Sequence, residues 1–438
     1  MSLRDALDRT LLLMRDEIEE SVPDETMLAA LTGTRIALIA DGKNLVSHSA
    51  QTALVAAALL MARSGHAVHL FAPDVVMRGA QRPLGAGGII TELMKVGKDM
   101  LPGIEFSLAT PTEPFDLILA FGDTETTLSA QRSVRLNATD WSGSLTRESV
   151  PWPASDWPLG GLTAATLATG EAFKCAIHKL ASGAKNPRRM DTVFAPTDEV
   201  QYLLAPEDTP KSGAVGAFDC ISGGAIIHAV LYILSRLPGL SGYARVIEPD
   251  TADLSNMNRY ALLLRSMLAS PKADHLAQLF AGSGLEIDGV NLRYDPTARA
   301  TLRLAPAVFV GVDDIPTRWE VQRARPEWLA VGATTHWCAM ASFHEAGLGC
   351  AECAHPYDDP SAGPIPTVSF VSFWAGLLIA SYYLRHMAGQ AATVHEQQIF
   401  LPAFRTENAV RSIVHIRPDC LSCSTKPDPA FGVSRMAG

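Results

Sequence analysis

The sequence predicts an α/β protein made of two doubly wound domains that pack together as a pseudo-dimer. The chain has 438 residues, which is more than one hydrophobic core usually sustains. Continuous apolar runs of strand length alternate with longer helical segments, and this alternation is typical of a parallel sheet covered by helices. The same series of elements then occurs a second time, which predicts two copies of one domain.

The first series follows an amphipathic, acidic helix that we predict over residues 1–20. A strand over 35–40, a helix over 50–64 and a strand over 67–72 form a βαβ unit. Residues 182–210 are interpreted as a connection that contains one strand. The remaining predicted elements are a helix near 89–96, strands at 116–121 and 134–141, and a helix at 162–181.

The second series matches the first in order. Its predicted elements are strands at 215–221, 244–248 and 307–312 and an apolar helix at 369–386, which correspond to 35–40, 67–72, 116–121 and 162–181. We therefore predict a first domain over residues 1–195, a linker over 196–213 and a second domain over 214–438. Only the second copy carries the polar segment described below, so we expect the first copy to bind no nucleotide.

Charge and hydropathy exclude two classes of partner. The net charge of −10 argues against nucleic acid, because binding phosphates along a strand needs an excess of Lys and Arg. The uncharged run 366–384 is nearly long enough to span a bilayer, but it contains serines and lacks a basic flank at its N-terminal side. We expect a buried helix there, no membrane association and a cytoplasmic protein.

Residues 246–260, VIEPDTADLSNMNRY, carry the strongest functional signal. A short apolar strand ends in Glu248 and Asp250, and an acid at the end of a buried parallel strand can accept ribose hydroxyls. Asn256 and Arg259 lie three residues apart and share a face if a helix begins at Ser255. Because an Arg there can neutralise phosphate oxygens, the segment favours a nucleotide whose phosphates bend over a helix start.

Two further features fit phosphate binding. The turn Ser222-Gly223-Gly224 joins a strand to a helix, where backbone N–H groups can meet phosphates. It lacks the GxGxxG pattern, which counts against a nicotinamide or flavin enzyme. Lys272, at the start of a helix predicted over 271–280, can supply a second cation.

Asp313 and Asp314 follow the buried strand 307–312, at the edge where open α/β sheets bind ligands. Carboxylates at this place can hold Mg²⁺ against nucleotide phosphates. We assign the Mg²⁺ role to Asp313 and a helix-capping role to Asp314.

The cysteines divide into a metal set and isolated thiols. Two CxxC pairs have the spacing of a structural zinc site, with an iron–sulfur cluster as the alternative. Cys338, two residues after His336, is either a nucleophile or a packed thiol. The predicted zinc ligands are Cys350, Cys353, Cys420 and Cys423.

Residues 214–425 resemble the ThiF/MoeB and ubiquitin-activating-enzyme superfamily. The resemblance rests on the order of EPDTADLSNMNR, SPK, VDDIPTR and the paired CxxC motifs. It implies two Rossmann-like adenylation domains, the first inactive and the second active. This compact duplicated layout is similar to that of the activating enzymes of bacterial ubiquitin-like conjugation operons. Arg318 falls on the arginine of the family motif that contains Asp313. The residues that the resemblance implies for ATP binding are Glu248, Asp250, Asn256, Arg259, Lys272 and Asp313.

Members of this superfamily adenylate the C-terminal glycine carboxylate of a ubiquitin-fold protein with Mg²⁺-ATP. The resemblance therefore implies a ubiquitin-like protein and a conjugating enzyme as partners, and it leaves open whether two such pseudo-dimers pair into a homodimer. It further implies that an N-terminal Arg of the inactive copy reaches the ATP of the active one. Arg9 is our candidate, with Arg4 and Arg15 as alternatives.

The step after adenylation stays open. Relatives that form a thioester carry a Cys in the segment that corresponds to 354–370, and this chain has none there. Either Cys338 or another thiol takes over, or the enzyme stops at the acyl-adenylate like a sulfur-carrier adenylyltransferase. The motifs are also compatible with a peptide-modifying enzyme, and the non-enzymatic possibility is a catalytically dead, zinc-stapled scaffold.

Overall fold

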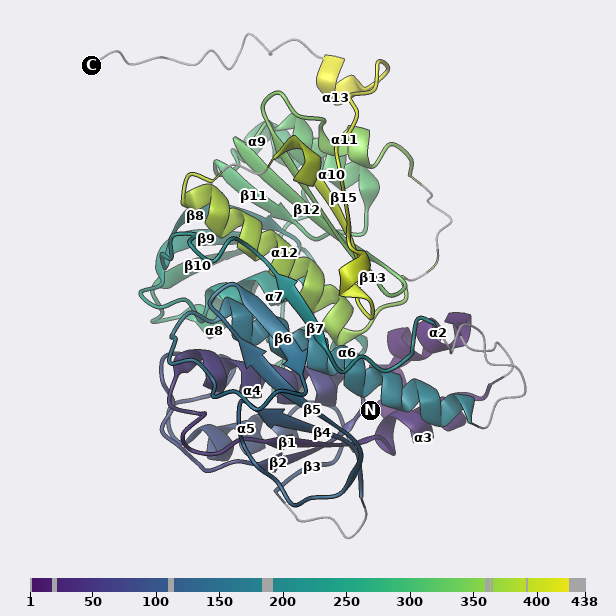
Figure 1. Cartoon of the computed structure of the whole chain (residues 1–438). Helices are drawn as coiled ribbons and strands as arrows, with labels where there is room; N and C mark the ends of the chain where they lie inside the picture. The colour runs from purple at the N-terminus through teal and green to yellow at the C-terminus, as the bar shows by residue number, and fades with distance from the viewer. Residues whose placement is uncertain are drawn as a thin grey trace.

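The computed structural model describes residues 2–17, 22–108, 114–182, 192–358, 363, 365–390 and 393–424. These residues form two mixed β-sheets, one above the other in Figure 1, with long helices between them. This confirms the predicted α/β fold class with two doubly wound sheets.

The first sheet has the strand order β3-β2-β1-β4-β5-β6-β7. The neighbouring strands from β3 to β5 are parallel, whereas β6 and β7 join antiparallel. The last strand, β7, lies within the predicted linker 196–213 and completes this sheet. The strands are β1 (Arg35–Ile39), β2 (Ala67–Phe71), β3 (Phe106–Ser107), β4 (Phe115–Phe121), β5 (Ala130–Ala138), β6 (Ser142–Thr146) and β7 (Val200–Leu203).

The second sheet repeats this plan in the order β10-β9-β8-β11-β12-β13-β14-β15. Its strands from β10 to β12 are parallel and the last three join antiparallel, so each strand has a counterpart except the additional edge strand β15. The strands are β8 (Ala214–Ile221), β9 (Ser241–Ile247), β10 (Leu285–Val290), β11 (Ala307–Val310), β12 (Trp328–Thr335), β13 (Cys338–Glu345), β14 (Gln398–Pro402) and β15 (Val410–Ser412).

Four helices lie between the sheets and form the contact between the halves. In the first half α4 (His48–Arg63) packs on α6 (Leu159–Ala181), and in the second half α7 (Ala225–Leu234) packs on α12 (Ser369–Met387). The helices α6 and α12 also contact each other, and one continuous apolar core includes residues of both halves. Because α12 is buried along nearly its whole length, the prediction of a buried helix at 369–386 is confirmed. Among the described helices, none combines the length and apolarity needed to cross a membrane.

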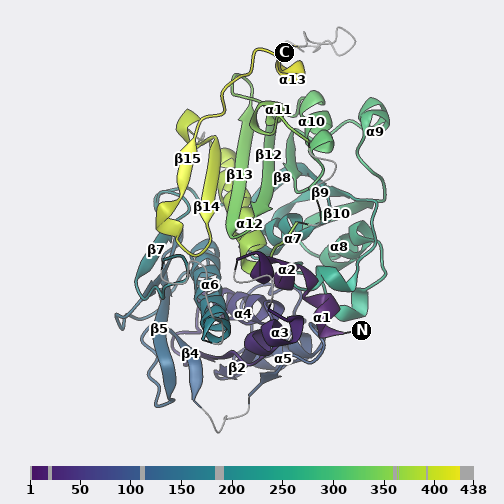
Figure 2. The same cartoon turned by 90° about the vertical axis from the view of Figure 1, so that its right-hand side faces the viewer.

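Shorter helices cover the outer faces and the ends of the sheets. Figure 2 shows the N-terminal helices lying across the junction of the two halves, beside α7 and α8. These helices are α1 (Leu3–Ala6), α2 (Asp8–Glu17), α3 (Asp24–Thr32), α5 (Ile89–Lys98), α8 (Lys272–Phe280), α9 (Pro296–Thr301), α10 (Ile315–Arg323), α11 (Ala351–Ala354) and α13 (Leu421–Ser424), together with the 3₁₀ turns Leu254–Asn256, Arg265–Met267, Val394–Glu396 and Thr406–Asn408.

The N-terminal helix differs from its prediction. One helix was expected over residues 1–20, but α1 ends at Ala6 and α2 begins at Asp8, and residues 18–20 lie outside the described residues. At the break Ala6 and Leu7 are fully buried, and the Asp8 carboxylate accepts the backbone N–H of Arg9 at 2.6 Å. The kink turns α2 across the second half, where Arg9 becomes part of the site.

Candidate functional site

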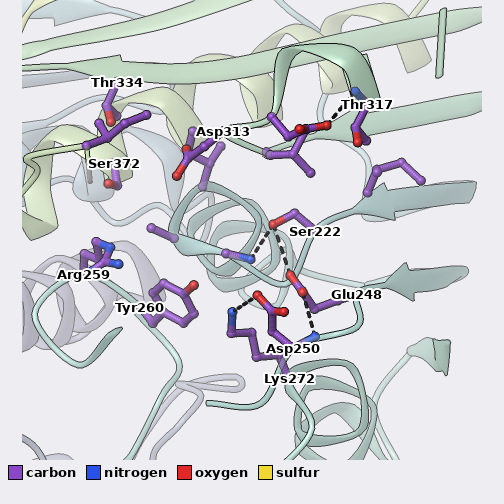
Figure 3. A pocket seen from close by; sticks show the side chains of 18 of the residues that line it. Ser222, Glu248, Asp250, Arg259, Tyr260, Lys272, Asp313, Thr317, Thr334 and Ser372 are labelled. Carbon is purple, nitrogen blue, oxygen red and sulfur yellow. Dashed lines mark hydrogen bonds and ion pairs between the residues drawn. The ribbon is translucent and has the colours of Figure 1, made fainter. Parts of the chain in front are cut away.

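A cavity of about 280 Å³ opens at the carboxyl ends of β8, β9 and β11. From β8 the chain continues to β9 on one side, and later returns to β11 on the other side. Such a switch point is where open α/β sheets bind ligands, because the loops diverge there. The cavity walls come from both halves of the chain, since Arg9 of α2 lines it together with residues of the second sheet. Figure 3 shows its interior.

Three predicted cations reach this cavity from three separate segments: Arg9, Arg259 and Lys272. The Nη1 of Arg9 donates to the carbonyl of Ile365 at 3.3 Å, while its Nε is buried with no hydrogen-bond partner among the described residues. Burial lowers the pKa of Arg259, and it still keeps its charge at neutral pH because the ordinary value is so high. The cavity therefore offers positive charge from three directions, which suits a polyphosphate.

The alternative N-terminal arginines lie elsewhere. Arg4 and Arg15 both pair with Asp24 of α3, and they line a neighbouring cavity with Arg9. Of the three predicted donors, Arg9 alone lines the cavity at the second sheet among the described residues.

Lys272 is held at the first position of α8. Its side chain is 9% exposed, and Nζ contacts the Asp250 carboxylate at 3.1 Å and lies 5.8 Å from the Tyr260 ring centre. Burial lowers the pKa of Lys272, but Tyr260, Glu248 and Asp250 more than offset it, so the net shift is upward. The ammonium group is therefore charged and fixed toward the cavity (Figure 3).

The Gly turn is organised by Glu248. The Glu248 carboxylate accepts the N–H of Gly223 at 2.6 Å and the N–H of Asp250 at 3.0 Å, while the N–H of Gly224 donates to the Ser222 hydroxyl at 2.8 Å. Ser222 has a φ of 111°, a strained value for a residue with a side chain. The ribose-binding role of Glu248 stays a prediction, whereas its carboxylate oxygens are seen to fix the loop after β8, so the turn is preorganised by the acid.

Gly223 itself does not line the cavity, although Gly224 does. A Cβ at Gly223 would lie 3.0 Å from the Lys272 side chain and 3.1 Å from that of Glu248. The residue is small because two site residues pack against it.

The segment after Asp250 forms no α-helix. The shared face proposed for Asn256 and Arg259 required a helix beginning at Ser255, whereas the structure has one 3₁₀ turn, Leu254–Asn256, capped by Asp253. The Asn256 side chain is 8% exposed and its carbonyl accepts the N–H of Asp253 at 2.9 Å. Asn256 therefore closes the capping box and does not line the cavity, whereas Arg259 does.

The two acids after β11 divide their roles geometrically. Asp314 caps α10 by accepting the N–H of Thr317 at 2.8 Å, as predicted. Asp313 is exposed and lines the cavity, facing Arg259 across it (Figure 3). Arg318 is buried and donates to the Val312 carbonyl at 2.8 Å and 3.1 Å, which fixes the backbone beside Asp313. A free carboxylate at this edge is a suitable ligand for Mg²⁺.

Four thiols gather at the far end of the second sheet. The Sγ atoms of Cys350, Cys353, Cys420 and Cys423 all lie within 4.8 Å of one another, and four of the separations are 3.2, 3.4, 3.6 and 3.7 Å. These separations are too long for disulfides, whereas tetrahedral Zn–S bonds of about 2.3 Å put sulfurs about 3.8 Å apart. The predicted pairing of the two CxxC motifs is confirmed, and its geometry fits zinc.

Cys338 stands apart from both sites. It begins β13, its Sγ donates weakly to the Ala339 carbonyl, and it does not line the cavity. Burial raises the pKa of the Cys338 thiol, so little thiolate is present at neutral pH. Its surroundings fit a packed thiol better than a nucleophile.

Several lining residues were not found from the sequence. Tyr260, 5% exposed, forms a floor between Lys272 and the buried ring of His228, whose centre is 4.6 Å away. Its place directly after Arg259 was the one signal for it, because the neighbours of a site residue share its loop. Others are Arg293, Tyr294, Thr317, Thr334, Thr367 and Ser372.

One curated relative matches about half of the chain at low sequence identity. No family model matches the chain. "Uncharacterized protein y4jF" of Sinorhizobium fredii (strain NBRC 101917 / NGR234) is 26% identical over 225 residues, which cover 51% of this chain and 41% of that protein. The matched region thus spans about two fifths of that relative's length.

Solved structures show weak similarity as well. E. coli MccB gives a TM-score of 0.40 at 16% identity, covering 48% of this chain and 65% of that chain. E. coli MccB with AMPCPP and selenomethionine MccA gives 0.42 at 14% identity, covering 66% and 97%. PaaA gives 0.35 at 11% identity, covering 46% and 73%. Similarity at this level does not define a function.

Proposed function

We propose that the chain is an adenylyltransferase that uses ATP to activate a carboxylate. The observation that carries this proposal is the convergence of Arg9, Arg259, Lys272 and Asp313 on one cavity at the switch point of the second sheet. Three of the cations that line the cavity, Arg9, Arg259 and Lys272, lie around a space beside a preorganised Gly turn, and the Asp313 carboxylate faces them without an ion pair among the described residues. Such a set binds a polyphosphate and a divalent cation, and it lacks a His–acid pair for general acid–base chemistry.

The reaction requires little proton transfer. A carboxylate oxygen of the acceptor attacks the α-phosphorus of ATP, the bond from that phosphorus to the bridging oxygen breaks, and pyrophosphate leaves with the electron pair. An acyl-adenylate, a mixed anhydride, is formed. Mg²⁺ held by Asp313 would neutralise charge on the phosphates. Arg259 and Lys272 offset the negative charge that builds up at the α-phosphate, and Arg9 does the same from the first half.

The acceptor that we propose is the C-terminal carboxylate of a ubiquitin-like protein. The support is the resemblance of the SNMNR, SPK and VDDIPTR motifs to those of ubiquitin-activating enzymes. Under this proposal a conjugating enzyme receives the activated protein, and the first half contributes Arg9 without binding ATP itself.

One observation favours a second candidate, an enzyme that releases its product as the adenylate or as a thiocarboxylate. Cys338 lies outside the cavity with a raised thiol pKa, and the described part of the segment 354–370 supplies no thiol to the cavity. A sulfur-carrier adenylyltransferase needs no nucleophilic Cys at this place.

The test is ATP–pyrophosphate exchange. Small proteins that end in Gly and are encoded beside this gene are the acceptors to try, and exchange should require one of them. Arg259→Ala should lower the exchange rate by about 100-fold, because an electrostatic donor to the reacting phosphate is lost. Arg265→Ala is the matched control, since Arg265 lies six residues away, is 39% exposed and pairs with Asp99.

The outcomes separate the candidates. A wild-type protein that binds no Mg²⁺-ATP would show the proposed function to be wrong. Exchange accompanied by a thiol-labile adduct that disappears in Cys338→Ala would favour thioester transfer over release of the adenylate.

A further inference from the structure

Arg63 is a fully buried cation that belongs to the first half and contacts the site segment of the second half. It is the last residue of α4 and is 0% exposed. Its Nη1 donates to the carbonyl of Met257 at 2.7 Å, and its Nη2 donates to the carbonyls of Leu263 at 2.5 Å and Ala261 at 3.4 Å. These three carbonyls flank Arg259 and Tyr260, the two side chains that this segment places in the cavity.

The segment needs such a partner because it has no regular structure of its own. Between the 3₁₀ turns Leu254–Asn256 and Arg265–Met267, residues 257–264 form neither helix nor strand. The Leu262 carbonyl is bound by His275, which leaves those of 257, 261 and 263 to Arg63. A buried carbonyl without a donor costs free energy comparable to a lost hydrogen bond.

Arginine is the residue type that can do this. A guanidinium presents five N–H donors in a fixed planar fork, whereas a lysine presents one compact ammonium group. No carboxylate lies within ion-pair distance of Arg63 among the described residues, so the carbonyl dipoles are its counter-charge. Burial lowers the pKa of Arg63 to about 10, which still leaves it charged at neutral pH.

A second contact from the first half holds the same segment. The Asn258 amide donates to the Thr10 hydroxyl of α2 at 2.9 Å, and its oxygen accepts from Arg259 Nη1 at 2.8 Å. The backbone around Arg259 is thus held by α4, and its side chain is held through a residue bound to α2.

We propose that Arg63 is a positioning residue of the nucleotide site: the first half uses it to fix residues 257–263, so that Arg259 points at the phosphates. This inference rests on the proposed function, because it assigns a role to Arg63 through Arg259. The first half thereby contributes to nucleotide binding through α4, away from the carboxyl ends of its own strands.

The chain offers a matched control in Arg236. Arg236 is also buried, at 1% exposure, burial lowers its pKa to about 10 as well, and it also joins the halves, by donating to the Arg82 carbonyl at 2.6 Å. Its other donor contacts are the Tyr232 carbonyl and the Ser235 hydroxyl, and none is to residues 257–263. Arg63→Met and Arg236→Met therefore remove similar buried charges from the same interface.

The experiment measures binding of the fluorescent analogue mant-ATP with Mg²⁺ to the full chain, with thermal unfolding of each variant beside it. Arg63→Met should weaken binding by about tenfold or more, since small displacements of a positioned group have large effects. Arg236→Met should bind within about twofold of the wild type. Hydrogen exchange of the amides of 257–263 should accelerate in Arg63→Met and stay unchanged in Arg236→Met.

A double-mutant cycle tests the route of the effect. If Arg63 acts through Arg259, Arg63→Met should cost little further affinity in an Arg259→Ala background. Additive losses, or equal losses in Arg63→Met and Arg236→Met, would overturn the proposal. If Arg63→Met does not fold, Arg63→Lys takes its place, because it keeps the charge and loses part of the donor fork. Its loss of mant-ATP affinity should be smaller than the loss expected for Arg63→Met. Wild-type affinity in Arg63→Lys would also overturn the proposal. A wild-type chain that binds no mant-ATP rejects the proposed function instead.

Discussion

The two halves share one strand order, yet their corresponding strand ends differ in how their acids are used. After β11, Asp313 faces the cavity without an ion pair among the described residues. After β4, its counterpart Asp123 binds Lys43 Nζ at 2.8 Å and Asn44 Nδ2 at 2.8 Å. The first half thus neutralises internally the acid that the second half leaves open to a ligand.

The acids after the neighbouring strands show the same contrast. Asp250, after β9, is 62% exposed and contacts Lys272 at 3.1 Å. Its counterpart Asp74, after β2, accepts the N–H groups of Ile90 and Thr91 at 2.8 Å and 3.1 Å and so caps α5. One topology therefore gives either a site or a self-satisfied loop, and the local partners of the acids decide which.

The largest effect is expected from the four-thiol cluster, which among the described residues occurs in the second half and not in the first. Cys420→Ser should remove bound zinc and lower the thermal midpoint by about 10 °C, since each kcal/mol shifts the midpoint of such a domain by about 2–4 °C. Metal analysis and calorimetry measure both. Cys175→Ser, a thiol within α6, is the control that should keep the metal. A wild-type protein that contains no metal and is no more stable than Cys420→Ser would contradict the zinc assignment.

A smaller effect is expected on activity alone, from the paired acids. Asp313→Ala should lower ATP–pyrophosphate exchange by about 100-fold, because the proposed Mg²⁺ ligand and its field are lost. Asp123→Ala should leave exchange within about twofold, since Asp123 is bound to Lys43 and Asn44. Equal effects of the two substitutions would mean that the acids of both strand ends contribute to the chemistry, which would contradict the difference between Asp313 and Asp123.

The smallest effect concerns Lys43→Met, which removes the cation from Asp123. The hydrogen bond from Lys43 lowers the pKa of Asp123, so this pair stabilises the fold above the unfolded Asp pKa of about 3.9 and loses its effect as pH falls through the lower folded value. Thermal midpoints of wild type and variant should therefore differ slightly at neutral pH and converge in acid. A difference that grows in acid would show that another group controls this loop.

Much of this molecule could be predicted from its sequence, and the reason is periodicity. Buried parallel strands such as β4 and β11 are continuous apolar runs, so their ends and the acids after them can be located directly. Glu248, Asp250 and Asp313 followed from the same logic, because strand ends of one sheet lie at one edge, whereas Arg9 was expected only from the family resemblance. The CxxC spacing likewise placed the four thiols together.

The differences from prediction have two causes: a competing local hydrogen bond at Asn256, and partners far away in the chain for Arg63. Asn256 closes a capping box with Asp253 in place of facing a ligand, and only one 3₁₀ turn forms around Ser255. Arg63 reads as an ordinary helix-terminal cation, and only tertiary structure shows which carbonyls it contacts. No local pattern encodes such contacts.

The shared core between α4, α6, α7 and α12 has a consequence for how this molecule behaves on dilution. In an assembly of two separate chains, the contact that brings Arg9 and Arg63 to the site would depend on protomer concentration. Here both halves belong to one polypeptide, so their association is intramolecular and its effective concentration is set by the connecting chain. Each molecule therefore keeps Arg9 and Arg63 beside the cavity at any concentration, so under the proposed function its specific activity should not fall through separation of the halves on dilution.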